Sequence, residues 1–286
     1  MRIAVAVEHG WDPATVEVDP LTGAVDEPRT LSGLGASSRA AVALALRLRG
    51  AGGRVEVLAA APAVADEELR SLLAAGVDAV IRVWAEGLAA AGTEAAARAL
   101  AGPLAAASAD LVLTGGRTLD GGAGTLGPML AELLGLAEAT AVEHLAVTAG
   151  GGEVTVRRRL ERGARELLAL ALPAVVCVEP GIAALEDAPL PALLATRRAP
   201  VPVLEAAPGG AAGGCRRVRR LPPRPRPRRL AAPDPSLPVE ARLAAVLGGG
   251  ERLDQEHALV EGPPALLVER ILALLEERGY LSPPPG

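Results

Sequence analysis

The stretch Asp110–Pro128, with the sequence DLVLTGGRTLDGGAGTLGP, is the part of the chain that decides the predicted fold. Asp110–Leu113 contains a short apolar run of the kind found in buried strands, and Thr125–Leu134 has the composition of a helix. The loop between them is rich in glycine, so its backbone N–H groups can approach phosphate oxygens, and the N-terminus of the following helix favours an anion. We predict a nucleotide-binding loop here; a flexible connection without a ligand is the alternative.

Short apolar runs and Ala/Leu-rich segments also alternate on the N-terminal side of this loop. Strands are predicted at Arg2–Val7, Arg54–Ala59 and Ala79–Trp84. Helices are predicted at Ser37–Arg49, Asp66–Ala75 and Thr93–Ala107. This strand–helix alternation predicts an α/β fold, in which a parallel sheet is covered by helices on both faces.

The pattern changes on the C-terminal side of the loop. Three strands separated by turn residues predict an antiparallel excursion, at Val142–Val147, Glu153–Arg159 and Glu166–Leu172. A further buried strand at Pro173–Val178 and a helical turn at Leu190–Leu194 follow. From about Val203 the chain becomes rich in Gly, Pro and Arg, which is typical of a linker or an extended arm. We expect a main domain at 1–203, an arm at 204–240 and a helical appendage at 241–286, with helices at Val239–Val246 and Pro264–Arg278.

Composition excludes several classes of protein. The formal charge of the 286 residues is −5, which gives no general attraction to nucleic acid or to anionic membranes. No apolar stretch reaches about 18 residues without interruption, so no membrane span is expected. The N-terminus lacks the features of a signal peptide, and we expect a cytoplasmic protein. Cys177 and Cys215 form no C-x-x-C pair, so neither a zinc site nor a disulfide framework is indicated, and Cys177 is expected to be a buried thiol.

Candidate catalytic and metal-binding groups are sparse. His9, His144 and His257 are scattered, and none has a metal-ligand partner at a useful spacing. No Ser–His–Asp, Cys–His or paired-carboxylate arrangement can be assembled, so we predict no catalytic residues. An arginine-rich stretch, 216–229, has three interpretations: a contact with nucleic acid or an acidic surface, an arm lying against a partner subunit, which we favour because the chain is acidic and the stretch lacks aromatics, or a solvated linker.

The loop also contains a G-x-G-x-x-G pattern at Gly122, Gly124 and Gly127. This pattern suggests a dinucleotide-dependent oxidoreductase that acts alone. The first of these glycines, however, comes eight residues after the predicted strand, and the unit is the fourth strand rather than the first. We keep this function as an alternative, together with a non-redox adenine-nucleotide-binding module.

Two motifs, which occur along the chain in the same order as in a known family, make the chain resemble that family. The first is the loop at 114–128, and the second is Val156–Leu168, VRRRLERGARELL, followed by Pro173–Cys177. With these motifs the chain resembles the β-subunit family of electron transfer flavoproteins over about residues 1–203. One position departs from the family pattern, because Arg162 stands where an acid or glycine is usual.

The resemblance implies a Rossmann-like fold, an α-subunit partner that holds most of an FAD site, and a bound AMP. The nucleotide-binding residues would be Ala6, Gly35, Ala60, Gly115, Thr118, Asp120, Gly121, Gly122, Gly124 and Thr125. Several side chains usual in the family are replaced, at Gly35–Ser38, Gly121–Gly122 and Thr125, and Glu8-His9 stands in place of Lys-Arg. The resemblance implies AMP as the bound nucleotide, whereas these replacements leave a second FAD or no nucleotide as alternatives.

The resemblance also implies a relay of electrons rather than chemistry on a substrate. A dehydrogenase would reduce the FAD, and the heterodimer would pass the electrons to a downstream acceptor. Leu190, in a proline-rich loop, matches the apolar anchor that docks on the dehydrogenase. His9 and Trp11 end the first strand at the ligand-facing edge of the sheet, where a flat aromatic ring would lie near a flavin; a packed surface tryptophan is the alternative for Trp11.

Overall fold

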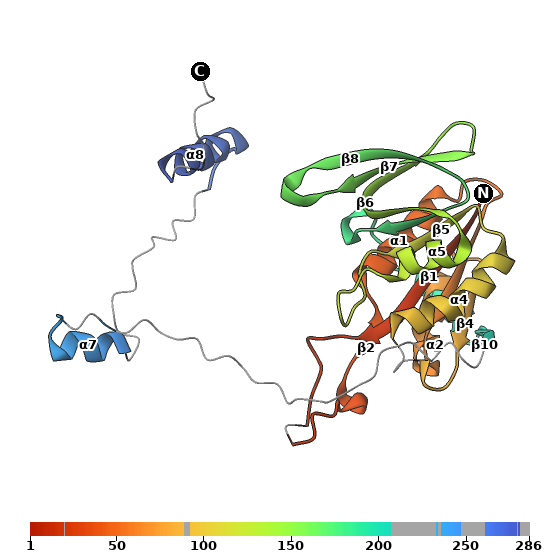
Figure 1. Ribbon diagram of the computed structural model, residues 1–286, viewed down its shortest axis with the longest axis horizontal. Coiled ribbons are helices and arrows are strands. Elements are labelled where there is room, and N and C mark those ends of the chain that lie inside the picture. Colours follow the sequence, from red (N-terminus) through yellow and green to blue (C-terminus); the bar gives the residue numbers. More distant parts are fainter. Residues whose placement is uncertain are drawn as a thin grey trace. The chain divides into compact units, whose positions relative to one another are not determined.

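The computed structural model describes residues 1–19, 21–88, 92–206, 233, 236–246, 261–278 and 280 (Figure 1). These residues fall into two compact units that divide between Pro223 and Arg224. The arginine-rich stretch, Cys215 and His257 lie outside the described residues, so the interpretations given for them stay predictions.

The first unit is built on a ten-stranded mixed sheet, which confirms the predicted α/β class. Its strands are β1 (Arg2–Trp11), β2 (Ser32–Leu34), β3 (Arg54–Ala60), β4 (Ala79–Trp84), β5 (Leu111–Gly115), β6 (Ala137–Val147), β7 (Glu153–Arg159), β8 (Arg165–Ala171), β9 (Ala174–Val178) and β10 (Val203–Glu205). They lie in the order β10-β4-β3-β1-β5-β9-β6-β7-β8, with β2 beside β1. The pairs from β10 to β6 are parallel, whereas β6–β7, β7–β8 and β1–β2 are antiparallel. The predicted antiparallel excursion is therefore confirmed as β6–β8.

Helices cover both faces of the parallel part of the sheet (Figure 1). They are α1 (Ala36–Leu48), α2 (Asp66–Ala74), α4 (Thr93–Ala107), α5 (Leu126–Leu134) and α6 (Leu190–Thr196), with short 3-10 turns at Glu27–Arg29, Ala63–Ala65, Glu161–Gly163 and Pro180–Ile182. Residues of α1 and α2 share one core with Ile3, Val5 and Val7 of β1, while residues of α4 and α5 share the other with Ala4 and Ala6. The alternation of side chains along β1 thus supplies both cores, as expected for a strand buried on two faces.

Small aliphatic side chains fill these cores, because the chain contains no phenylalanine. Ala41, Ala45, Ala95 and Ala97 on the helices are fully buried, and they face Val and Leu side chains of the strands. Alanine at these positions lets the helices approach the sheet closely, so packing is achieved by short distances rather than by large rings.

Two three-residue strands escape prediction, because a period of two residues cannot be recognised over so short a run. One of them, β10, pairs in parallel with β4 through Val203, Leu204 and Glu205. It crosses the boundary predicted at residue 203, so the sheet extends at least two residues beyond it. The division of the chain at 203 and 240 otherwise stays a prediction.

The predicted start of one long strand lies too far along the sequence. The predicted Val142–Val147 is the second half of β6, which begins at Ala137. Its first half pairs with β9, and the register shifts between Ala139 and Val142, where Ala141 has a left-handed φ of 54°. This bulge interrupts the alternation of side chains, which hides the first half of the strand from a search for a regular pattern.

The second unit contains α7 (Val239–Val246) and α8 (Pro264–Glu277), both predicted from the sequence. Every described residue of α8 is at least partly exposed, including Leu266, Ile271 and Leu274. Within the described parts of the chain, no helix is both long enough and apolar enough to cross a membrane.

Candidate functional site

The carboxyl ends of β1 and β5 form the point where the order of the parallel strands reverses. From β1 the chain runs outward through β3 to β4, and α4 then leads back across to β5 on the other side of β1. The connections therefore leave β1 and β5 in opposite directions and open a crevice between them, which is where ligands bind in open α/β sheets. The predicted nucleotide loop starts at this point, since Gly115 ends β5.

Two predicted site residues, Gly115 and Gly35, bring the loop against the start of α1, and a third, Gly124, packs within the loop. A Cβ on Gly115 would lie 2.7 Å from the backbone nitrogen of Ser38. A Cβ on Gly35, which precedes α1, would lie 3.4 Å from the backbone nitrogen of Leu119. Within the loop, a Cβ on Gly124 would lie 2.5 Å from the carbonyl oxygen of Gly116. Close backbone approach therefore explains why Gly115 and Gly124 are glycine, whereas a Cβ on Gly35 would be at ordinary van der Waals distance.

The remaining loop residues either form hydrogen bonds within the loop or are exposed. Thr118 donates its backbone N–H to Ala123 at 2.9 Å, and Asp120 accepts the N–H of Gly121 at 2.5 Å. Gly122 adopts a φ of 64°, and Gly121, Gly122, Gly124 and Thr125 are exposed. Thr125 precedes α5 and makes no side-chain capping bond, and Pro128 has no N–H, so the first three residues of this nine-residue helix offer an anion the N–H groups of Leu126 and Gly127 alone.

Two predicted residues lie deeper than the others. Ala6 is fully buried in β1, where it pairs with Leu58 and Thr114, and Ala60 is the last residue of β3, with 7% of its surface exposed. Both are small, so they form a low wall beneath the crevice. A ligand would contact Ala60 at the carboxyl end of β3, whereas Ala6 lies deeper, inside the sheet, and would not touch the ligand.

The end of β1 carries polar groups that the site prediction did not include. The carboxyl of Glu8 is largely buried, and burial raises its pKa to about 7, with a further rise from Asp120 and an opposing hydrogen bond from Thr93. Among the described residues, Glu8 Oε2 and Thr118 Oγ1 are buried and have no hydrogen-bond partner. The only signal for Glu8 in the sequence was its place after the apolar run of the first strand.

His9 and Trp11, predicted to lie near a flavin, follow on the same strand. Both pair with β2, His9 opposite Leu34 and Trp11 opposite Ser32. Burial lowers the pKa of His9, although Glu68 opposes the shift. The indole of Trp11 is 37% exposed, so part of the ring is available at the edge of the sheet. Their proximity to a flavin stays a prediction.

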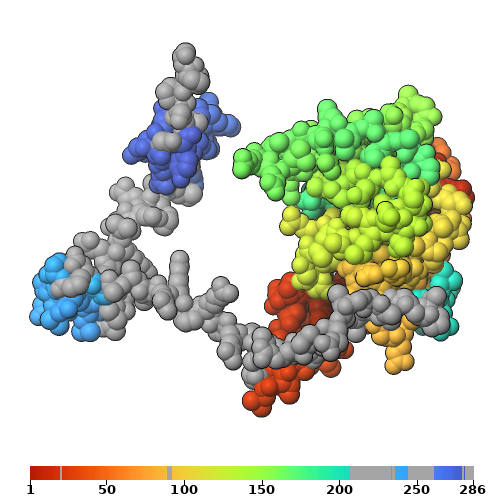
Figure 2. Space-filling view, in the orientation of Figure 1, coloured from red at the N-terminus to blue at the C-terminus, as the bar shows by residue number. Residues whose placement is uncertain are grey.

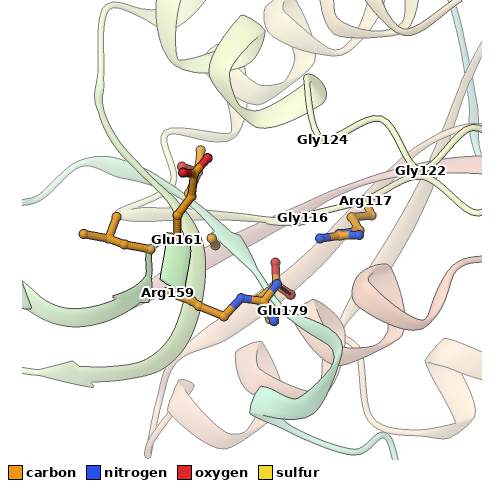
Figure 3. A pocket seen from close by; sticks show the side chains of 10 residues that line it. Gly116, Arg117, Gly122, Gly124, Arg159, Glu161 and Glu179 are labelled. Carbon is orange, nitrogen blue, oxygen red and sulfur yellow. Dashed lines mark hydrogen bonds and ion pairs between the residues drawn. The ribbon is translucent and has the colours of Figure 1, made fainter. Parts of the chain in front are cut away.

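A cleft of about 710 Å³ lies on the other side of the glycine-rich loop (Figure 3). Its lining residues come from the loop, from the bulge of β6 and from the ends of β7 and β9: Gly116, Arg117, Gly122, Gly124, Thr140, Ala141, Arg159, Leu160, Glu161 and Glu179. Arg159 pairs with Glu179 at 3.0 Å, and Arg117 extends toward the same carboxylate from the opposite side. Figure 2 shows the surface of the β7–β8 segment, in green, directly beside that of the loop and α5, in yellow-green.

The second family motif forms the turn between β7 and β8. Arg158 pairs with Glu166 at 2.6 Å across the two strands, and Glu143 of β6 pairs with Arg157 at 3.4 Å and also with Arg165. The unusual Arg162 has a φ of 56°, in the left-handed region, and Gly163 follows with a φ of 81°. The family's preference for glycine or an acid at this position thus has a physical reason, since left-handed backbone suits glycine and Asp best.

The G-x-G-x-x-G pattern combines residues with unrelated roles. Gly122 and Gly124 lie in the loop, whereas Gly127 lies in the first turn of α5, where a Cβ would stand 2.0 Å from Cys177 Sγ. Gly127 therefore packs the helix onto β9. Cys177 is buried as predicted, and desolvation raises the pKa of its thiol to about 12. Among the described residues, no group of three or more His, Cys, Asp or Glu side chains could hold a metal ion.

Leu190, the predicted docking residue, begins α6 and is 67% exposed. Leu193 and Leu194 of the same helix are exposed as well. The segment after the helix is fixed to α2, because Arg70 donates a hydrogen bond to the carbonyl oxygen of Ala199 at 2.9 Å. An apolar, solvent-exposed helix is thus held on a rigid support.

Comparisons with known proteins agree with this geometry. Residues 22–208 match the electron transfer flavoprotein domain. The chain is 30% identical over 219 residues to Protein FixA of Rhizobium meliloti, a match that covers 74% of this chain and 75% of that protein. It is 30% identical over 183 residues to Protein FixA of Azorhizobium caulinodans, covering 62% of this chain and 65% of that protein.

A third relative is named as a β-subunit. The chain is 29% identical over 164 residues to the electron transfer flavoprotein subunit beta of Thermoanaerobacterium thermosaccharolyticum, covering 57% of this chain and 62% of that protein. The matches to this relative and to the Azorhizobium protein span slightly less than two thirds of each relative's length. The chain belongs to the electron transfer flavoprotein family, as a member of its β-subunit type.

Proposed function

We propose that this chain relays electrons as the β-subunit of a heterodimer, with an α-subunit that holds most of an FAD and a dehydrogenase that supplies the electrons. The match of residues 22–208 to the electron transfer flavoprotein domain carries this proposal. FAD supplies the redox chemistry when it is bound. The chain itself contributes shape, a docking helix and part of the electrostatic surroundings, and we propose that none of its side chains is catalytic.

The residues present fit an adenine mononucleotide at the crevice between β1 and β5. The exposed loop from Gly122 to Thr125, together with Leu126 and Gly127 at the start of α5, offers backbone N–H groups to a phosphate. The buried, unpartnered Thr118 Oγ1 and Glu8 Oε2 are polar atoms that a ligand would satisfy, since such atoms rarely stay unpaired in a folded protein. AMP bound by these groups would be structural, because no reacting bond lies near it.

Docking of a dehydrogenase on α6 is supported by the exposure of its leucines. Leu190 follows Pro189 and precedes Pro191, so the backbone around the anchor is already restricted and little entropy is lost on binding. We propose that the complex works in the cytoplasm and does not bind nucleic acid, and the formal charge of −5 supports the second part of this proposal.

Co-expression with the cognate α-subunit tests the proposal. The purified complex is denatured, and the released nucleotides are identified by mass spectrometry. FAD together with AMP is the expected result, and the flavin should bleach when a donor dehydrogenase and its substrate are added. Release of NAD, with turnover by this chain alone, would instead support the stand-alone oxidoreductase and contradict the relay.

A further inference from the structure

Glu8 differs from the other residues of the crevice because it brings a buried carboxyl group to a place expected to receive an anion. It lies on β1 opposite Ala60 of β3, on the face of the sheet covered by α4 and α5. One of its oxygens, Oε2, is buried and has no hydrogen-bond partner among the described residues. Thr93, the first residue of α4, forms a hydrogen bond with the carboxyl group.

A second carboxylate faces Glu8 from the glycine-rich loop. Asp120 acts on Glu8 as a like charge, and its carboxyl carbon lies 3.3 Å from the position of a Cβ on Gly10, two residues beyond Glu8. Asp120 is exposed, and its carboxyl group accepts the N–H of Gly121.

Among the residues that the structure describes, no cation contributes to the pKa of Glu8. The charged residues near the start of α4, Glu94 and Arg98, pair with each other at 2.9 Å. The neighbouring strands end in Ala60 and Gly115, which carry no charge. His9 points to the opposite face of the sheet, where Glu68 is the charge that acts on it. A nucleotide that entered with its phosphate would therefore meet two carboxyl groups and no facing arginine.

We infer that Glu8 binds the nucleotide as the neutral acid, with its buried Oε2 as a proton donor to an acceptor atom of the ligand. A protonated carboxyl group has one O–H to donate, which matches one unpartnered oxygen, whereas a carboxylate at the same place would leave a charged, buried Oε2 without a donor among the described residues. The neutral acid also leaves the Glu8–Asp120 pair with a single negative charge. The inference rests on the proposed nucleotide site. It makes Glu8 the residue that weakens nucleotide binding at alkaline pH.

The consequence is an uptake of a proton when the nucleotide binds. At pH 8 free Glu8 is mostly ionised, because its pKa is raised only to about 7. Binding as the acid should take up close to one proton per AMP, and affinity should fall by about tenfold per pH unit above neutrality. The second ionisation of the AMP phosphate, near pH 6, is complete at pH 8 and does not contribute.

The test is calorimetric titration of the full chain, freed of co-purified nucleotide, with AMP at pH 8 in two buffers of different ionisation enthalpy. Wild type and Glu132→Gln, an exposed carboxyl of α5, should take up the proton. Glu8→Gln should bind AMP with no uptake and with an affinity that does not change between pH 7 and 9. Asp120→Asn should shift the fall in affinity to a lower pH than in wild type, because the like charge that raises the pKa of Glu8 is removed.

Three results overturn the inference. AMP binding without proton uptake in wild type shows that Glu8 does not gain a proton. Proton uptake that persists in Glu8→Gln assigns it to another group. An unshifted profile in Asp120→Asn removes the Glu8–Asp120 pair as its cause. If wild type and the heterodimer both fail to bind AMP at any pH, the proposed nucleotide site itself is wrong, and that outcome is distinct from the other three.

Discussion

Gly115 at the end of β5 and Ser38 in the first turn of α1 approach so closely that a Cβ on Gly115 would lie 2.7 Å from the backbone nitrogen of Ser38. The contact joins two segments that are far apart in sequence, and it sets the position from which the nucleotide loop leaves the sheet. Because the obstructing atom is backbone, it cannot be displaced by a change of side-chain rotamer.

Gly115→Ala should therefore damage both the fold and the nucleotide site. Overpacking of this kind costs about 1–3 kcal/mol, and the loop should shift away from α1. We expect a lower unfolding midpoint in urea and loss of co-purified AMP. Gly150→Ala is the matched control, since no atom lies within 4 Å of its Cβ position. Equal stability and equal AMP content in both variants would contradict the structural role of this contact.

Glu8 should make the stability of the protein depend on pH. Its pKa is raised from 4.5 to about 7 in the folded chain, so the folded state holds a proton that the unfolded state releases between these values. The stabilisation is complete below pH 4.5 and is lost as the pH rises through 7. Glu8→Gln should become more stable relative to wild type by roughly 3 kcal/mol across this window.

Urea unfolding from pH 5 to pH 8 measures this difference directly. Glu132→Gln serves as the control, because that exposed carboxyl should leave the pH profile of wild type unchanged. Parallel profiles for wild type and Glu8→Gln would show that Glu8 titrates as an ordinary surface acid.

Arg162 should be a position where glycine stabilises the protein. A left-handed backbone costs a non-glycine residue about 1–2 kcal/mol, while glycine loses more entropy on folding, so Arg162→Gly should gain roughly 0.5–1 kcal/mol. Gly163→Ala, one residue later with a φ of 81°, should lose stability by a similar amount. Thermal unfolding of both variants gives the sign of each change, and a loss of stability in Arg162→Gly would refute the account.

Gly127 and Cys177 should behave as a coupled pair. Gly127→Ala places a methyl group 2.0 Å from Cys177 Sγ and should cost about 1–3 kcal/mol. Removal of the sulfur in the double variant with Cys177→Ala should restore part of this loss, so the two changes should not add. A phosphate-binding role for Gly127 makes the opposite prediction, because AMP would then be lost in the single variant and not regained in the double variant.

Leu190→Ala should weaken docking of the donor dehydrogenase without destabilising the chain, since the side chain is 67% exposed. Burial of a leucine in a partner's pocket is worth about 1.5–3 kcal/mol, so KM for the electron carrier should rise by roughly 10–100-fold. Leu167→Ala on β8, 71% exposed, is the control and should leave KM unchanged. A lower kcat at constant KM would place Leu190 outside the docking surface.

Much of the fold could be predicted from the sequence because its strands and helices keep regular patterns. The boundaries of Ala79–Trp84, Glu153–Arg159 and Thr93–Ala107 agree with the structure. β2, β10 and the first half of β6 could not be found, because three residues or a bulged register give no periodic signal. The loop at 114–128 was identified through glycine, whose close contacts follow from its lack of a side chain.

The chemistry of the site was harder to predict than its position. Glu8 has an unusual pKa only because α4 and the glycine-rich loop bury it, and neither contact can be read from the residues around it. The cleft beside Arg117 and Arg159 depends on the ends of four separate elements, which come together through strand order rather than through sequence spacing.

The short strand β10 protects the sheet from aggregation, which matters during synthesis of the chain and for the choice of a shortened fragment. It covers the outer edge of β4, whose backbone groups would otherwise be an open template for strands of other chains. During synthesis this edge stays uncovered until residues 203–205 have left the ribosome, after the rest of the sheet is complete. A shortened chain that ends at residue 202 would keep every residue of the nucleotide crevice and yet be prone to aggregate, so a soluble minimal fragment has to extend through Ala206.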